Sequence, residues 1–190
     1  MEPGVDARAG SSGSDTRARL NRWRLTAWAS ASLLLLLPAA AMRFTEQLDW
    51  GPADFVVFGI MLLTACGAFE VAVRRSADPR YLAGAGVAIA AGFILVWMNL
   101  AVGLIGDEGN LANRLVGGIL AVGIIGAGIA RLRPAGMARA MLATATAQGL
   151  VGLIAVSPGF GGSALPSMFF MLPWLLSAWL FRSAERGHRG

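Results

Sequence analysis

The chain has 190 residues, 56% of them hydrophobic and 14% charged, with a formal net charge of +5 at pH 7. Soluble domains carry about 25% charged residues, so this composition excludes an ordinary soluble domain and indicates a membrane protein. The positive charge does not indicate a nucleic-acid partner, because the arginines flank hydrophobic stretches and attraction to anionic lipid headgroups explains them. The lipid bilayer is the expected partner.

Six apolar segments follow one another along the chain, each close to the roughly 20 residues that cross a bilayer as a helix. They are expected near Leu25–Met42, Trp50–Val73, Tyr81–Ile105, Ala112–Ala130, Met137–Val156 and Pro166–Phe181. The sequence therefore predicts an all-α membrane protein with a six-transmembrane-helix bundle. The expected domains are a disordered basic cytoplasmic tail over 1–22, the transmembrane domain over 23–182 and a short cytoplasmic tail over 183–190.

The first two spans begin with recognisable signals. A basic start, a leucine-rich centre and Ala39–Ala41 also fit a cleaved signal peptide, but the long tail before them favours a retained span. In the second span, Pro52 suits the first helical turn and Asp54 complements the positive end of the helix dipole.

The arginines alternate between connectors. Lysine is absent, and 14 of the 16 arginines lie before the first span or after the second, fourth and sixth. The other connectors hold only Arg43 and Arg114. Because cytoplasmic loops retain basic residues, this alternation predicts that both termini are cytoplasmic.

The reactive side chains that membrane enzymes use are scarce. Cys66 is the only cysteine and His188 the only histidine, which excludes an internal disulfide, a Cys-x-x-Cys redox pair and a histidine-based haem or copper site in the bundle. The absence of lysine excludes Schiff-base chemistry. We therefore expect no enzyme activity, no catalytic residues, no cofactor and no metal.

Four polar side chains within the predicted spans are candidates for function. Glu70 is the one acid in a span, although Arg74 four residues later offers it an interfacial ion pair. Thr144 and Gln148 share a face of the fifth span, and Asn99 lies in the third. Buried amides in hydrocarbon hydrogen-bond across helices, so we favour a packing role over a solute contact.

The densest polar segment, Gly106–Asn113, lies between the third and fourth spans. Its candidate residues are Asp107, Glu108, Asn110 and Asn113. Their oxygens are of the type that Ca²⁺ and Mg²⁺ accept, but the spacing does not match an EF-hand. A solvated turn in which Asn113 caps the fourth helix is the favoured interpretation.

Two patterns bear on how the helices are arranged. Aligning Gly59 with Gly118 also aligns Gly67 with Gly126, which favours two-helix hairpin repeats, although glycine-rich helices also match by chance. Small residues recur four apart, a spacing that lets helices approach closely, and we favour packing within one bundle over a dimer seam. The pairs are Ala88 and Gly92, Gly117 and Ala121, and Gly123 and Ala127.

The segment Trp97–Gly106, with the acidic turn and Ala112-Asn113 after it, resembles a motif of an uncharacterised family of small bacterial multi-pass inner-membrane proteins with no assigned activity. The similarity covers the second to fifth spans. That family has an Asn-Pro-Ala-Asn turn where this chain has Asn110-Leu111-Ala112-Asn113, so the proline is missing. The resemblance implies an architecture and a bacterial inner-membrane location, with no catalytic residues to carry over.

Two functions of different classes fit these features. The first is a non-enzymatic inner-membrane accessory or assembly subunit that acts through helix packing, with a membrane-protein partner or as a homo-oligomer. The alternative is a small transporter or channel for an unidentified solute, with Glu70, Asn99 and Gln148 along its path. We favour the first, because ion-coupled transport usually shows a paired acid, histidine or arginine at mid-depth.

Overall fold

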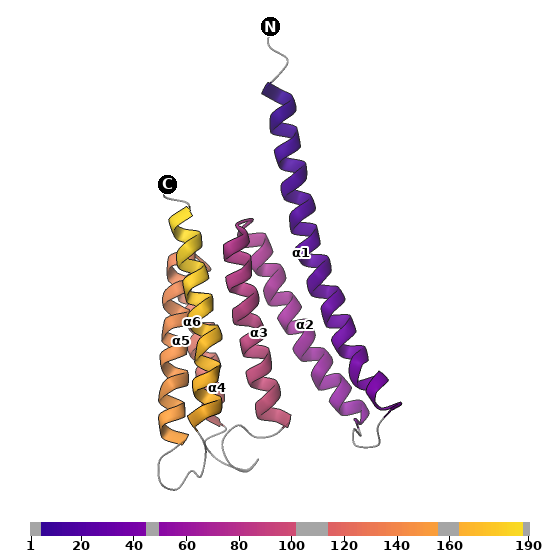
Figure 1. Ribbon diagram of the computed structural model, residues 1–190, viewed down its shortest axis with the longest axis vertical. Helices are drawn as coiled ribbons and strands as arrows, with labels where there is room; N and C mark the ends of the chain where they lie inside the picture. The colour runs from indigo at the N-terminus through magenta and orange to yellow at the C-terminus, as the bar shows by residue number, and fades with distance from the viewer. Residues whose placement is uncertain (1–4, 45–49, 102–113, 156–163, 188–190) are drawn as a thin grey trace. The chain divides into compact units, whose positions relative to one another are not determined.

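The structure, a computed structural model, describes residues 5–44, 50–101, 114–155 and 164–187. This part of the chain is all-helical and contains six helices (Figure 1). The chain divides into two compact units, unit 1 over Met1–Ala77 and unit 2 over Asp78–Gly190. Each unit has its own helix contacts.

Unit 1 is a pair of helices, α1 (Val5–Ala41) and α2 (Pro52–Arg75), which pack against each other. The start of α2 has the signals expected from the sequence. Pro52 occupies its first turn, and the carboxylate of Asp54 accepts a hydrogen bond of 2.8 Å from the backbone N–H of Gly51. The helix ends after Arg74 and Arg75, which complement its negative end.

α1 begins within the segment 1–22, which the sequence predicts to be a cytoplasmic tail. The structure describes helix from Val5 onward, and the disordered cytoplasmic tail over 1–22 stays a prediction. No proline interrupts α1 before Pro38, although Gly10 and Gly13 lie in this stretch and glycine has low helix propensity. The described part of α1 therefore continues well before the apolar segment that begins near Leu25.

Unit 2 contains α3 (Pro79–Ala101), α4 (Arg114–Ile129), α5 (Pro134–Ala155) and α6 (Ala164–Gly187). The helix α6 packs against both α3 and α5, and α5 also packs against α4. The side chains that this packing removes most completely from solvent include Tyr81, Leu82, Leu95, Ile119 and Phe181. They come from α3, α4 and α6, so the core of unit 2 lies among the helices rather than along one seam.

The last helix also extends further than expected. α6 continues to Gly187, into the segment 183–190 that was expected to be a tail. Ser183 and Ala184 are buried, and the carbonyl of Ser183 accepts a hydrogen bond of 3.3 Å from the Arg80 guanidinium. Packing against α3 thus accounts for the extra helical turn.

The membrane-like character expected from the composition is confirmed. In the described residues, α1, α2, α3 and α5 are long and apolar enough to cross a membrane. A shorter apolar helix, Leu115–Ile129, lies within α4. The residues expected to begin the fourth span, Ala112 and Asn113, lie outside the described residues.

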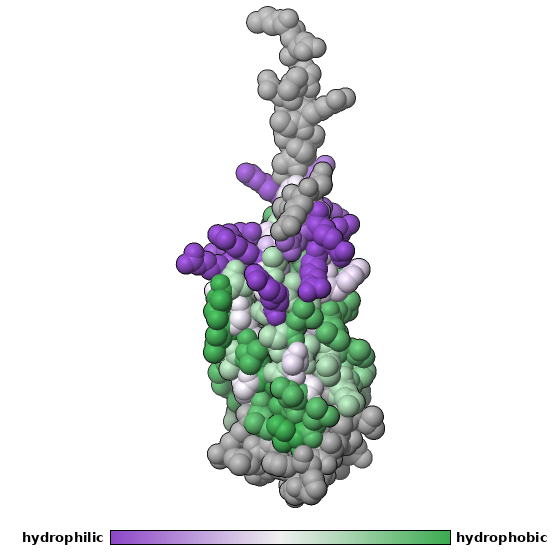
Figure 2. Space-filling view, turned by 90° about the vertical axis from the view of Figure 1, so that its left-hand side faces the viewer, coloured by the Kyte–Doolittle hydropathy of each residue, from purple (hydrophilic) through white to green (hydrophobic). Residues whose placement is uncertain are grey.

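Most arginines of unit 2 lie at one of its ends, and Arg114, at the start of α4, is an exception. The Tyr81 hydroxyl donates a hydrogen bond of 2.9 Å to the carbonyl of Leu132, which joins the start of α3 to the α4–α5 connection. The Arg80 contact with Ser183 joins that start to the end of α6. Figure 2 shows the hydrophilic residues gathered at the end where α6 finishes, with hydrophobic residues over the helices below.

Candidate functional site

Glu70 is held between two arginines in unit 1. The Arg24 guanidinium binds both carboxylate oxygens, with Nε 2.7 Å from Oε2 and Nη2 2.7 Å from Oε1. Arg74, one turn later on α2, places its Nε 3.0 Å from Oε1. The ion pair with Arg74 was expected from the spacing of the two residues. The bidentate ion pair with Arg24 of α1 was not expected. Such a paired arrangement fastens α1 to α2 and occupies the carboxylate.

The neighbouring contacts of unit 1 also join its two helices. The Arg19 guanidinium donates a hydrogen bond of 3.4 Å to the carbonyl of Ala77, just after α2 ends. Cys66 is buried, and its Sγ lies 3.8 Å from the carbonyl of Ala27 on α1. The polar contacts of Arg19, Arg24 and Cys66 therefore hold α1 and α2 together.

Thr144 and Gln148 are both buried in unit 2, with 0% and 1% of their surfaces exposed. The Thr144 hydroxyl donates a hydrogen bond of 2.9 Å to the carbonyl of Ala140 in its own helix. On α4, a Cβ added to Gly123 would lie 3.2 Å from the Thr144 oxygen, so the glycine makes room for this side chain. α4 and α5 therefore pack closely against each other at Gly123 and Thr144.

Gln148 has a different environment. Its Oε1 is buried and has no hydrogen-bond partner among the described residues, and the same is true of the Trp174 Nε1 on α6. A buried acceptor and a buried donor that both lack a partner are costly in hydrocarbon. Together with the Oδ1 of Asn99, these two atoms are the buried polar side-chain atoms without a partner in the described part of unit 2.

Helix register places Gln148 and Trp174 at a similar depth. Gly149, next to Gln148, would meet Met171 of α6 at 3.0 Å if it carried a Cβ. A Cβ on Gly92 of α3 would meet Trp174 at 3.7 Å and Leu120 of α4 at 3.6 Å. Since Met171 and Trp174 are less than one helical turn apart, all four helices of unit 2 reach this layer. We call the Gln148 and Trp174 side chains the mid-depth polar pair.

Asn99 lies nearer the end of α3 and is only partly buried, although its Oδ1 also lacks a partner among the described residues. Four further candidates, Asp107, Glu108, Asn110 and Asn113, lie outside the described residues. The structure therefore brings Thr144 and Gln148 onto one buried stripe and places Glu70 in the other unit.

Sequence reasoning missed Ser177, which is fully buried on α6. Its hydroxyl donates a hydrogen bond of 2.7 Å to the carbonyl of Gly84 on α3. A Cβ on Gly84 would lie 3.2 Å from the Leu180 Cβ, so the two helices are already in close contact there. The sequence does contain a signal for this contact. Ser177 lies three residues before Leu180, on the same side of the helix, and small polar residues favour helix–helix contacts in membranes.

The described residues contain no group of three or more histidine, cysteine, aspartate or glutamate side chains that could hold a metal ion. The polar contacts found in this part of the chain instead join helices. A scan of protein-family models and searches of curated proteins and solved structures found no match to the chain.

Proposed function

We propose that the chain is a non-enzymatic integral protein of a bacterial inner membrane, an accessory or assembly subunit that acts through helix packing. In this proposal it crosses the membrane six times, with both termini in the cytoplasm, as the alternation of the arginines indicates. The resemblance of Trp97–Gly106 to a family of small bacterial membrane proteins supports the same location.

The observation that carries the proposal is the use made of buried polar groups in unit 2. The Ser177 hydroxyl donates to a carbonyl of another helix, and the Tyr81 hydroxyl donates to the Leu132 carbonyl on the α4–α5 connection. Interhelical hydrogen bonds and close glycine contacts are the usual means of holding membrane helices together. These groups make a firm scaffold of α3 to α6, which is what a subunit that packs against other proteins requires.

One face of α2 offers a surface for a partner helix. Gly67 is exposed, a Cβ added there would meet nothing within 4 Å, and Leu63 and Val71 on the same stripe are 59% and 51% exposed. A small residue flanked by larger apolar ones lets a second helix approach closely. We assign this stripe, Leu63, Gly67 and Val71, as the contact with a membrane-protein partner or a second copy of the chain.

The test is a comparison of Gly67→Leu with Ala68→Leu after gentle detergent extraction from native membranes. Both positions are exposed, so both variants should fold as the wild type does. Gly67→Leu should lose a stoichiometric protein partner or dissociate a homo-oligomer, and Ala68→Leu, one position around the helix, should retain it. A wild-type chain that is extracted as a monomer with no stoichiometric partner would refute the proposal.

The mid-depth polar pair favours a second candidate, a small transporter or channel. A solute or water that passes through unit 2 would supply the partners that Gln148 Oε1 and Trp174 Nε1 lack. Glu70 does not support this candidate, because two arginines occupy its carboxylate. Complementation of a deletion strain by Trp174→Phe separates the two functions, with Trp179→Phe at an exposed position as the control. Loss of function in Trp174→Phe alone, with normal folding, would favour transport.

A further inference from the structure

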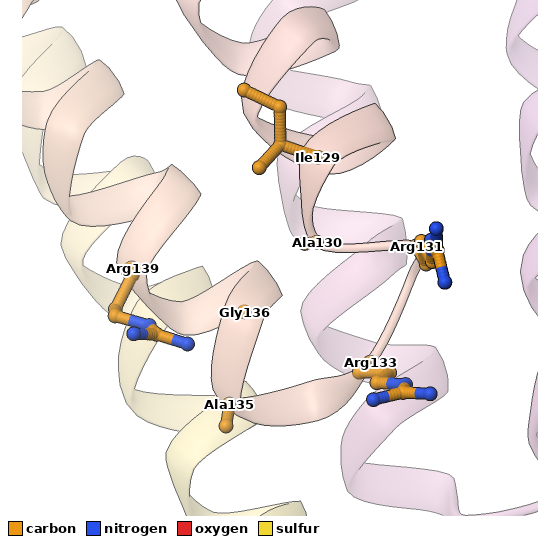
Figure 3. A pocket seen from close by; sticks show the side chains of 7 residues that line it. All are labelled: Ile129, Ala130, Arg131, Arg133, Ala135, Gly136 and Arg139. Carbon is orange, nitrogen blue, oxygen red and sulfur yellow. The ribbon is translucent and has the colours of Figure 1, made fainter.

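The connection between α4 and α5 forms a cavity of about 440 Å³. Seven residues line it, and Figure 3 shows them, with Arg131 and Arg133 on the connection and Arg139 on α5. They are Ile129, Ala130, Arg131, Arg133, Ala135, Gly136 and Arg139. Three arginines thus line one small space, and no acidic residue lines it. We call this cavity the arginine pocket.

The charges of the arginine pocket are not compensated within the described part of the chain. The side chains of Arg131, Arg133 and Arg139 make no hydrogen bond or ion pair with any described residue. Asp78 begins α3 at the same end, but its Oδ1 accepts the backbone N–H of Arg80 at 2.7 Å. Three like charges around a cavity create a positive potential, which favours the binding of an anion there.

The start of α5 adds backbone donors to the same pocket. The first N–H groups of a helix have no carbonyl partner, and those of Ala135 and Gly136 find no acceptor among the described residues. A Cβ on Gly136 would lie 2.6 Å from the Cβ of Ala130, so the glycine allows α5 to begin against the end of α4. Free N–H groups beside arginines suit the oxygens of a phosphate group.

The backbone of the connection is held in an unfavourable conformation. Arg131 and Leu132 have positive φ angles of 48° and 57°, in the left-handed region where glycine is the usual residue after a helix. The N–H of Leu132 bonds the carbonyl of Ala127 at 3.3 Å, and its own carbonyl accepts the Tyr81 hydroxyl. The fold therefore stabilises an arginine where glycine would fit better, and such strain is often found at binding sites.

An apolar surface leads away from the pocket along α4. Ile129 lines the cavity and is 79% exposed, and Ile125 and Val122 on the same stripe are 61% and 36% exposed. A phosphate group with an acyl chain attached can place its charge among the arginines and its chain along this stripe. Free phosphate would use only the first of these two surfaces.

We propose that the arginine pocket binds the phosphate of an anionic phospholipid headgroup, with an acyl chain lying along Ile129, Ile125 and Val122. The shared chemistry is a phosphate oxyanion held by guanidinium and backbone N–H groups. The exposed apolar stripe of α4 favours a lipid over inorganic phosphate as the source. This site is separate from the partner contact on α2 and does not depend on it.

The test measures phosphatidylglycerol bound to the purified full chain by native mass spectrometry, with phosphatidylcholine as the neutral lipid. The variant replaces all three arginines, as Arg131→Gln, Arg133→Gln and Arg139→Gln. The control removes the same charge elsewhere, as Arg75→Gln, Arg182→Gln and Arg186→Gln, at exposed positions outside the pocket. Each pocket arginine near the membrane surface should contribute on the order of fivefold, so the triple variant should bind on the order of a hundredfold more weakly.

The possible outcomes distinguish a phospholipid from inorganic phosphate as the ligand, or show that the arginine pocket is not a binding site. Selective loss of phosphatidylglycerol binding in the pocket variant, with the control near wild type, supports the lipid site. Competition by inorganic phosphate as strong as that by a short-chain phosphatidylglycerol supports the phosphate chemistry and overturns the lipid source. Equal loss in both triple variants, or equal binding of phosphatidylcholine by the wild type, overturns the site.

A variant with one substitution tests the same proposal if the triple variant does not fold. Arg131→Gly removes one charge and places glycine where the backbone favours it. We expect a higher Tm without lipid and phosphatidylglycerol binding on the order of fivefold weaker. A higher Tm with unchanged binding would show that Arg131 does not contact the lipid and would refute its place in the site.

Discussion

Unit 1 and unit 2 hold their helices together by different means. In unit 1, α2 buries a single stripe that includes Phe58, Leu62, Cys66 and Phe69, and residues 15–41 of α1 are mostly exposed. A carboxylate with two arginines fastens one end. In unit 2, helices meet at glycines with little spare room. The stability of unit 2 should therefore be sensitive to added atoms, and that of unit 1 to charge and ionic strength.

The largest effect should come from filling a close helix contact in unit 2. A Cβ on Gly126 would lie 2.8 Å from the Ala140 Cβ and 3.3 Å from its Cα, so α4 and α5 must separate. We expect Gly126→Ala to lower the free energy of unfolding by about 1–3 kcal/mol. Gly67→Ala in unit 1, where nothing lies within 4 Å, should be neutral or slightly stabilising. Equal effects in the two variants would remove the distinction between the units.

A smaller effect should come from the hydrogen bond between α6 and α3. Ser177→Ala removes the donor to the Gly84 carbonyl and leaves the glycine contact in place. Interhelical hydrogen bonds in membranes contribute about 0.5–1.5 kcal/mol, and we expect unfolding in a denaturing detergent to shift by that amount. Ser183→Ala is the matched control, because that buried hydroxyl bonds the Trp179 carbonyl of its own helix. A shift no larger than in the control would show that helix shape alone holds α3 to α6.

Much of the fold follows from local chemistry in the sequence. Hydrophobic stretches of spanning length require helices in a bilayer, and Pro52 with Asp54 sets the start of α2 within a residue or two of the expected position. The extent of α1 and α6 did not follow. The described α1 begins at Val5, ahead of the apolar segment. Packing of Ser183 and Ala184 accompanies the extension of α6 to Gly187, and neither extent shows in hydropathy.

The candidate sites were predictable only where partners are close in sequence. Glu70 and Arg74 are one turn apart, so their pair is visible in the sequence, whereas Arg24 reaches Glu70 from another helix. The arginine pocket depends on the positive φ angles of Arg131 and Leu132, at positions where sequence rules expect glycine. Contacts between helices and unusual backbone conformations require the fold itself.

Charge should matter more in unit 1 than in unit 2. Glu70→Gln removes the carboxylate that both arginines bind, and we expect faster hydrogen exchange in α1, with a difference that is larger at low salt than at high salt. Arg24→Gln should have nearly the same effect, because its guanidinium binds both oxygens from the other helix. Arg74→Gln, which breaks a contact within α2, should increase hydrogen exchange in α1 less than the other two variants do. Exchange in α1 that is independent of salt in all three variants would contradict this account.

The smallest change in stability should come from Gln148→Leu, although the residue is among the most buried polar groups of unit 2. Its Oε1 has no partner among the described residues, so the wild-type side chain already bears the cost of an unpaired acceptor. Leucine has a similar size and no polar atoms, and we expect a Tm equal to or slightly above that of the wild type. Thermal unfolding measures the Tm, and complementation of a deletion strain measures function. Retained function with unchanged or raised Tm fits the packing role, and lost function with unchanged Tm would assign Gln148 to a solute path. A marked fall in Tm would show that Oε1 has a stabilising partner and would contradict the account of the mid-depth polar pair.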